Sequence, residues 1–226
     1  WINREYVKNP LTSNIFNFRE QIHAAYLQYS GYIGAEDSVK WKYDIGFRAE
    51  QVFNHGAGVS NNVSVTRRYF NPFPTANLSY HFNALDYLKI GFSRRINRPD
   101  LGDLNPFIDI TDSLNQHGGN PYLKPELVNA AELGYYKEWK NVSFFSNLFY
   151  RYATNIIRPV IALNANGVAL TQPMNFGNMT TYGIEEIASI FPVKFWNANL
   201  SLSFFQQNIG GKIGRASCRE RVSLNV

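Results

Sequence analysis

Residues 39–50 alternate strictly between apolar and polar side chains. The apolar set is Val39, Trp41, Tyr43, Ile45, Phe47 and Ala49, and the polar set is Lys40, Lys42, Asp44, Gly46, Arg48 and Glu50. A period of two puts each set on one face of a β-strand, whereas a helix with about 3.6 residues per turn would scatter both sets around its surface. The pattern therefore predicts a strand with one apolar face and one wet face.

The same alternation predicts further strands along the chain. They cover residues 19–32, 76–82, 88–95, 128–136, 142–152, 182–191 and 198–206. Short turns are expected near residues 36, 85, 139 and 194, and long connections over residues 54–68, 96–126 and 154–181. Because short turns at one end and long loops at the other are typical of outer-membrane barrels, the expected fold class is all-β: an antiparallel transmembrane β-barrel meander, present in part, with about eight strands of a larger barrel.

Aromatic side chains collect near the expected short turns. They are Trp41, Tyr87, Trp139, Phe195 and Trp196. Aromatic residues at the edge of an apolar band form the girdle of a membrane barrel, so these five predict one membrane interface. The alternative is that they are core aromatics of a soluble barrel. A soluble carbohydrate-binding β-sandwich is a further alternative, but it would have polar outward strand faces.

Composition supports strands in a membrane. The chain is 45% hydrophobic and 15% aromatic, which argues against disorder, and only 17% charged, which is low for a soluble surface. The longest charge-free run, residues 159–184, is interrupted by Asn, Gly, Thr and Pro, so no helical span is expected. A spanning strand needs only about 9 to 11 residues.

The two ends of the chain look non-native. Residues 1–4 show no initiator Met and no signal peptide, and residues 212–222 break the strand pattern and resemble a translated sequencing adapter. We therefore expect an outer-membrane β-barrel domain over residues 1–211, truncated at both ends, and a non-native read-through tail over residues 212–226. The tail holds much of the formal charge of +5, so no nucleic-acid partner is expected.

Several segments resemble one known family. The most specific are residues 92–99, 104–109, 119–126 and 132–135, and weaker matches are residues 46–50, 73–80, 150–152 and 182–185. In their order and spacing, residues 19–208 resemble the outer-membrane β-barrel family of TonB-dependent-receptor-like proteins. Glu186 departs from the family pattern because a lipid-facing apolar residue is expected there, and no aromatic strand end closes the chain, so the register after Gly183 stays open.

The resemblance implies the architecture and partners of a transporter. It implies localisation in the cell outer membrane and a barrel of about twenty-two strands around an N-terminal plug. It also implies import of an unknown small ligand with energy from a TonB complex, with outer-membrane lipid around the wall. Neither a plug nor a TonB box is recognised in these residues. The family motif maps onto Arg98, Pro99, Asn105, Pro106, Asn120, Pro121, Lys124, Pro125 and Glu126.

Catalytic chemistry has no support in the sequence. The four histidines lack a metal-ligand spacing, a single cysteine excludes a multi-Cys site, and no G-x-S-x-G turn is present. We therefore expect no enzyme, no catalytic residue, no metal and no cofactor. Aspartates 100, 103, 109 and 112 fit a calcium loop less well than a solvated acidic loop, because their spacing matches no EF-hand. The prolines of that loop predict a shaped segment folded over the barrel mouth.

Charged residues on the wet strand faces are the candidate lumen residues. They are Arg48, Glu50, Arg95, Glu132 and Arg151. The arginines either contact a plug or an anionic solute, or form lumen salt bridges with Glu50 and Glu132. At the level of function, an energised transport receptor is the first hypothesis. A passive or adhesive barrel without energy coupling and a barrel-borne enzyme are the alternatives.

Overall fold

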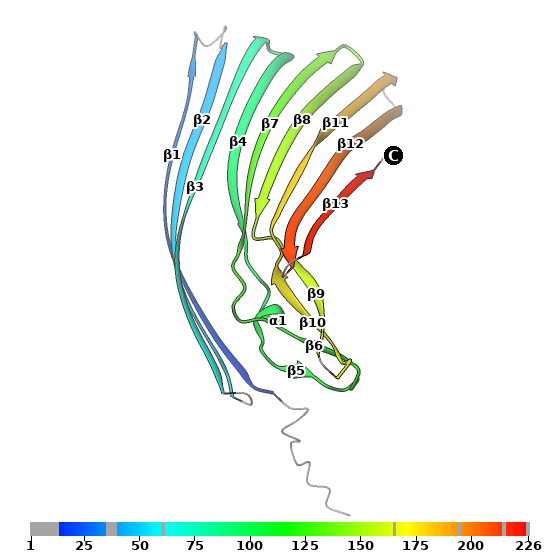
Figure 1. Ribbon diagram of the computed structural model, residues 1–226. Coiled ribbons are helices and arrows are strands. Elements are labelled where there is room, and N and C mark those ends of the chain that lie inside the picture. The colour runs from blue at the N-terminus through cyan, green and yellow to red at the C-terminus, as the bar shows by residue number, and fades with distance from the viewer. Residues whose placement is uncertain are drawn as a thin grey trace, which may run out of the picture.

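The computed structural model describes residues 14–34, 40–59, 62–164, 166–193, 196–213 and 216–224 (Figure 1). One large antiparallel sheet dominates it, with nine strands in the order β1-β2-β3-β4-β7-β8-β11-β12-β13. The strands are β1 Phe16–Ile33, β2 Trp41–Gly58, β3 Val63–Asn83, β4 Asp86–Asn97, β7 Glu126–Trp139, β8 Val142–Thr154, β11 Asn178–Val193, β12 Trp196–Ile213 and β13 Ala216–Leu224. The all-β antiparallel fold expected from the alternation is confirmed, and the sheet is open between β1 and β13.

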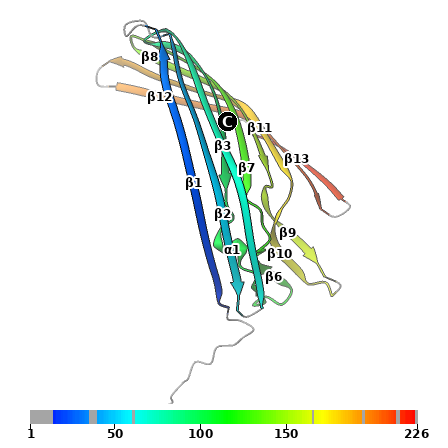
Figure 2. The ribbon, with the colours of Figure 1, turned by 90° about the vertical axis from the view of Figure 1, so that its left-hand side faces the viewer.

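A second, four-stranded sheet lies at one end of the large one. Its order is β5-β6-β10-β9, and β6 pairs with β10 in parallel. The elements are α1 Leu101–Leu104, β5 Ile108–Asp109, β6 Asn115–Gly118, β9 Ile157–Leu163 and β10 Ala169–Asn175. Figures 1 and 2 show them on the inner side of the curved large sheet. We call residues 98–125 together with 155–164 and 166–177 the inner loop assembly, and the sheet face it covers the inner face.

The register of the strands defines the opposite, outer face. On β2 the odd-numbered residues Trp41 to Ala57 point outward, and their partners on β1 and β3 share that face. Large apolar side chains are exposed there, including Leu27, Tyr29, Ile45, Phe47, Leu78, Ile90, Phe92, Leu133, Leu148, Tyr150, Leu200 and Phe204. Exposure of this many large apolar side chains on one face is expected only where lipid covers them. None of the described residues forms a helix that could span a membrane.

One expected loop is wrong. Residues 54–58 and 63–68 belong to strands, because β2 and β3 stay paired up to Gly58 opposite Val63, and residues 60 and 61 lie outside the described residues. Both faces of a strand that extends beyond the bilayer meet water or other protein, so its sequence loses the apolar face that marks a spanning strand. The polar composition of residues 54–68 reflects this position outside the bilayer. The long connections over residues 96–126 and 154–181 do exist, and they contain the small sheet.

The predicted aromatic girdle is confirmed only in part. Trp41, Trp139 and Trp196 are exposed at the short-turn end of the sheet. Tyr87 is opposite His81, on the inner face, and its ring stacks on Tyr136 with centroids 5.0 Å apart. Tyr87 therefore does not face lipid, because its position in the alternation is one residue away from the outer row. Phe195 lies outside the described residues.

The register after Gly183 is continuous. Strand β11 pairs with β8 and β12 without a shift from Asn178 to Ile190, which leaves Glu186 on the outer face opposite Ser146. The Ser146 hydroxyl donates to a Glu186 carboxylate oxygen at 2.9 Å. This carboxylate is the departure from the apolar pattern that the sequence analysis noted, and a neighbouring serine hydrogen-bonds to it within the wall.

Backbone pairing continues beyond residue 211. Strand β12 continues to Ile213, and β13 pairs with it from Ala216 opposite Ile213 to Leu224 opposite Phe205. The expected break concerned the alternation of side chains, and the pairing of backbones does not test it. Ladder hydrogen bonds join main-chain groups and require no particular side chains, so this pairing is compatible with any origin of the segment. A read-through origin for residues 212–226 stays a prediction.

Candidate functional site: the inner loop assembly and the wall that holds it

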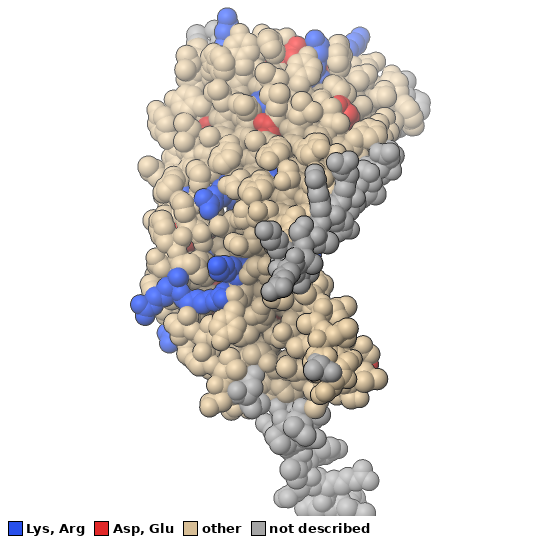
Figure 3. Space-filling model, in the orientation of Figure 1, with Lys and Arg blue, Asp and Glu red and all other residues tan. Residues whose placement is uncertain are grey.

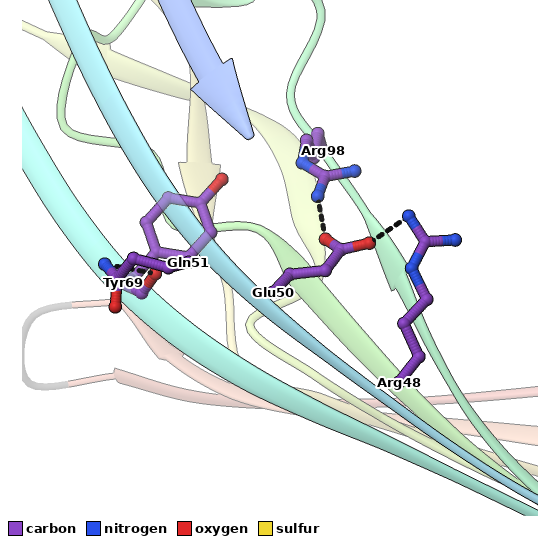
Figure 4. Close-up of polar contacts among 5 residues, drawn as sticks. All are labelled: Arg48, Glu50, Gln51, Tyr69 and Arg98. Carbon is purple, nitrogen blue, oxygen red and sulfur yellow. Dashed lines mark hydrogen bonds and ion pairs between the residues drawn. The ribbon is translucent and has the colours of Figure 1, made fainter. Parts of the chain in front are cut away.

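An ion triad around the buried carboxylate of Glu50 anchors the first loop to the wall. Glu50 on β2 is only 2% exposed, and its two carboxylate oxygens pair with Arg98 from the loop and Arg48 from β2 (Figure 4). Burial acts to lower the pKa of Arg98, but the hydrogen bond with Tyr69 and the charge of Glu50 outweigh it, so this pKa lies above its ordinary value. A carboxylate buried this deeply is stable only while its cationic partners stay in place.

A second contact joins the loop to β3. Both terminal nitrogens of Arg67 donate to main-chain carbonyls of the loop, those of Tyr122 and Leu123. Burial lowers the pKa of Arg67. Leu123 itself is 2% exposed, and the seam between loop and wall leaves a cavity of only about 70 Å³. Pro99, Pro121 and Pro125 line this seam, so the motif prolines shape the surface that packs on the wall.

The second loop is hydrogen-bonded to the first. The Asn175 amide accepts from the Lys124 main-chain N–H at 2.7 Å and donates to the carbonyls of Lys124 and Asn155, both at 2.8 Å. Asn120 donates to the Pro173 carbonyl at 3.1 Å. Each of these hydrogen bonds joins a side chain to a main-chain group, and together they hold the two loops as one packed unit.

Glu126 and Asn105 complete the framework. One Glu126 carboxylate oxygen accepts from the Ile157 main-chain N–H at 2.5 Å, and the other accepts from the Asn97 amide at 2.8 Å. The Asn105 side-chain oxygen accepts from the main-chain N–H of Phe107 at 3.2 Å and from the Asn14 amide at 2.7 Å. The motif residues thus build and seat the loop assembly, with Pro106 in the connection between α1 and β5.

Apolar packing closes the base of the second loop against the wall. Ala153 on β8, Ile209 on β12 and Ile156 in the loop form a buried cluster, and Val128, Phe176 and Met179 pack around it. Ile156 is 1% exposed. Four wall strands, β7, β8, β11 and β12, contribute to this cluster together with the loop, so the base of the assembly rests inside the curve of the sheet.

The loop assembly itself contains an open cleft. It measures about 500 Å³ and is lined by Asp103, Asn105, Phe107, His117, Thr171 and Pro173, among others. Asp109 and Asp112, by contrast, accept hydrogen bonds from their own loop, at Thr111 and Asn115 respectively, and these bonds lower both pKa values. Within the described ranges, no group of three or more His, Cys, Asp or Glu side chains could hold a metal ion.

The five candidate lumen residues all lie on the inner face by register. Glu132 and Arg151 form an ion pair at 3.7 Å, and the Arg151 guanidinium lies 4.5 Å from the centre of the Phe149 ring. Arg95 and Arg48 line a groove of about 630 Å³ on the wall. Arg48 and Arg151 therefore have carboxylate partners, whereas Arg95 has no ion pair in the part of the chain that the structure describes.

Sequence reasoning missed Arg67, Tyr69 and Asn175. The first two fall in or next to the segment that was expected to be a loop, although Val63, Val65, Arg67 and Tyr69 alternate with Ser64, Thr66 and Arg68 in the period of a strand. That alternation was the available signal. Asn175 offered none, because its partners lie 51 and 20 residues away along the chain.

The antiparallel sheet is open and curved, its outer face is apolar, its inner face is polar, and its long loops fold inward. Together these features define the wall of a transmembrane β-barrel. The comparison with family models agrees: the chain belongs to the Outer membrane protein beta-barrel family, whose model matches residues 1–224. The resemblance expected from the sequence is confirmed, and the protein is an outer-membrane protein.

Solved structures share this fold. The copper transporter OprC superposes with a TM-score of 0.63 at 14% identity, over 86% of this chain and 33% of OprC. The FrpB iron transporter from Neisseria meningitidis (F3-3 variant) gives 0.59 at 12% identity, over 92% and 33% of the two chains. The siderophore receptor PirA from Pseudomonas aeruginosa gives 0.55 at 14% identity, over 90% and 48%. The chain thus spans one third to one half of these proteins, and no curated protein matches it.

Proposed function

We propose that this chain is the wall and loop portion of an energised outer-membrane receptor that imports a small ligand. The observation that carries the proposal is the inward folding of both long loops. They are fixed to the inner face by Glu50, Arg67 and the Ile156 cluster, so they narrow the lumen where a ligand would enter. A lumen occupied by ordered loops suits selective capture better than free diffusion.

The neighbours in structure support the same class. Their names describe transport of copper or iron and reception of a siderophore, and none describes an enzyme. We therefore propose no catalytic residue and no cofactor for this chain. The partners of the proposal are an N-terminal plug, a TonB complex and a barrel of about twenty-two strands. The ligand site proposed within the loops is the cleft lined by Asp103, Phe107 and His117.

The test is ion conductance of the complete outer-membrane protein in a planar bilayer, with potassium chloride as the probe. A receptor closed by a plug gives no steady current, and the same protein should be retained by the immobilised periplasmic domain of TonB. A steady ohmic current without retention by TonB would overturn the proposal in favour of a passive barrel. Retention without current supports it.

A further inference from the structure

The outer face of β1, β2 and β3 changes abruptly along its height. Register groups its residues into rows of three, starting at the short turns with Ile33–Trp41–Tyr80. The next four rows are Gly31–Tyr43–Leu78, Tyr29–Ile45–Ala76, Leu27–Phe47–Pro74 and Ala25–Ala49–Pro72. These five rows contain no charged residue. The following rows are His23–Gln51–Phe70, Gln21–Phe53–Arg68 and Arg19–His55–Thr66.

Row spacing places Arg68 and Arg19 relative to the bilayer. Two residues advance about 6.7 Å along a strand, which is about 5 Å along the membrane normal at the usual strand tilt. Five steps from the Ile33 row therefore reach the His23 row at about 25 Å, the height of the apolar band of an outer-membrane barrel. Arg68 and Arg19 are one and two rows farther from the short turns than the His23 row, so they lie beyond that band, at the level of the lipid headgroups.

The two arginines have no anionic partner on their own face. Both are exposed, and neither forms an ion pair among the described residues. The outer-face rows of β1, β2 and β3 contain no Asp or Glu, and Glu20 and Glu50 point to the inner face. Figure 3 shows Lys and Arg side chains gathered at the lower left of the molecule. The Arg68 guanidinium lies 5.6 Å from the centre of the Phe53 ring, which holds it at the edge of the apolar band.

We propose that Arg19 and Arg68 form a binding site for the phosphate of a glycolipid headgroup in the outer leaflet. Two guanidinium groups above an aromatic and apolar band match an amphiphile that carries phosphate at the headgroup and acyl chains below it. With the short turns toward the periplasm, as in outer-membrane barrels, these rows meet the outer leaflet. The site depends on the outer-membrane location alone and not on what the barrel transports.

The experiment compares lipid binding by the complete outer-membrane protein in neutral detergent, followed by native mass spectrometry. The probes are bisphosphorylated lipid A and the same lipid with both phosphates removed. Arg19→Gln and Arg68→Gln should each weaken binding of the phosphorylated lipid about fivefold, and the double variant about 25-fold. Binding of the dephosphorylated lipid should be the same for all variants. Arg68→Lys should retain most of the affinity.

Lys140→Gln is the matched control, because Lys140 is an exposed cation in a short turn at the opposite rim. It should leave lipid binding unchanged. Unaltered binding of lipid A by the double variant would overturn the site, and so would an equal loss for both lipids, which would show apolar contact only. Complete displacement of lipid A by millimolar inorganic phosphate would replace the lipid by free phosphate as the ligand. Heat-modified gel mobility of each variant verifies that its barrel is folded.

Discussion

The two halves of β2 and β3 face different surroundings on the same pair of strands. On β2 from Trp41 to Ala49 the outer residues are apolar and the inner residues are Lys42, Asp44, Gly46 and Arg48, as lipid on one side and a wet lumen on the other require. Beyond Glu50 the inner face is the better buried one, with Val52 fully covered, because the loop assembly packs on it. The same pair of strands thus forms membrane wall up to Ala49. Beyond Glu50 it forms the surface on which the loop assembly packs, which we call the platform.

The largest expected effect is a loss of attachment between the loop assembly and the platform. Glu50→Gln removes the buried carboxylate that pairs with Arg98 and Arg48, so the largely covered Arg98 guanidinium and the more exposed Arg48 both lose their anionic partner. We expect the loop attachment to lose about 3 to 5 kcal/mol. The rate of amide hydrogen exchange in residues 98–125 should rise, whereas the segment of β2 from Trp41 to Ala49 should stay protected.

Glu132→Gln is the control for that change. Its pair with Arg151 is 3.7 Å long and both side chains are more than 40% exposed, so the loss should stay below about 1 kcal/mol. Equal effects of the two substitutions on loop exchange would show that the Glu50 triad is not the anchor.

The next largest effect is expected from a charge placed on the outer face of the membrane-spanning half of the strands. Phe47→Arg puts a guanidinium on the outer face in the middle of the apolar band, which should cost about 2 to 4 kcal/mol of barrel stability. Ser64→Arg lies on the same face of the neighbouring strand but well beyond the band, where the cost should be about 0 to 1 kcal/mol. Urea unfolding in lipid vesicles measures both, and similar losses would contradict the assignment of the lipid-facing segment.

A smaller effect is expected inside the loop assembly. A Cβ at Gly119 would lie 2.4 Å from the Asn105 carbonyl oxygen and 2.7 Å from that of Asp103, and both are main-chain atoms that cannot swing away. Gly119→Ala should therefore destabilise the assembly by about 1 to 3 kcal/mol. Proteolysis of residues 98–125 should accelerate, whereas Gly102→Ala, where a Cβ meets nothing within 4 Å, should leave it unchanged.

The smallest expected effect is a dependence on acid. Hydrogen bonds from Thr111 and Asn115 hold the pKa values of Asp109 and Asp112 below their ordinary value near 3.9. A pKa lowered by folding contributes stability above the unfolded value that is lost as pH falls through the folded value. Hydrogen exchange of residues 108–118, corrected for intrinsic rates, should rise below about pH 4. The double variant Asp109→Asn, Asp112→Asn should lose this dependence; retention of it would contradict the assignment.

Much of the wall was predictable because its rule is local. Lipid on one face forces an alternation that is readable within a dozen residues, and it located the eight strands of the large sheet that begin before residue 211. The platform was less predictable, because residues 54–58 and 63–68 lie beyond the bilayer, where lipid does not force an apolar face. Their strand character shows in the sequence as the weaker alternation from Val63 to Tyr69.

By itself, the sequence determined the all-β class, the lipid-facing row from Trp41 to Ala49, the short turns near residues 85 and 139, and the family motif; the turns expected near residues 36 and 194 lie outside the described residues. Only the tertiary structure decided where that motif goes, because Arg98 meets Glu50 across 48 residues of chain and Arg67 meets Leu123 across 56. It also decided that Tyr87 points inward and that Glu186 stays on the outer face. Alternation reports the surroundings of each residue, whereas contacts between distant segments depend on register and loop closure, which no local pattern encodes.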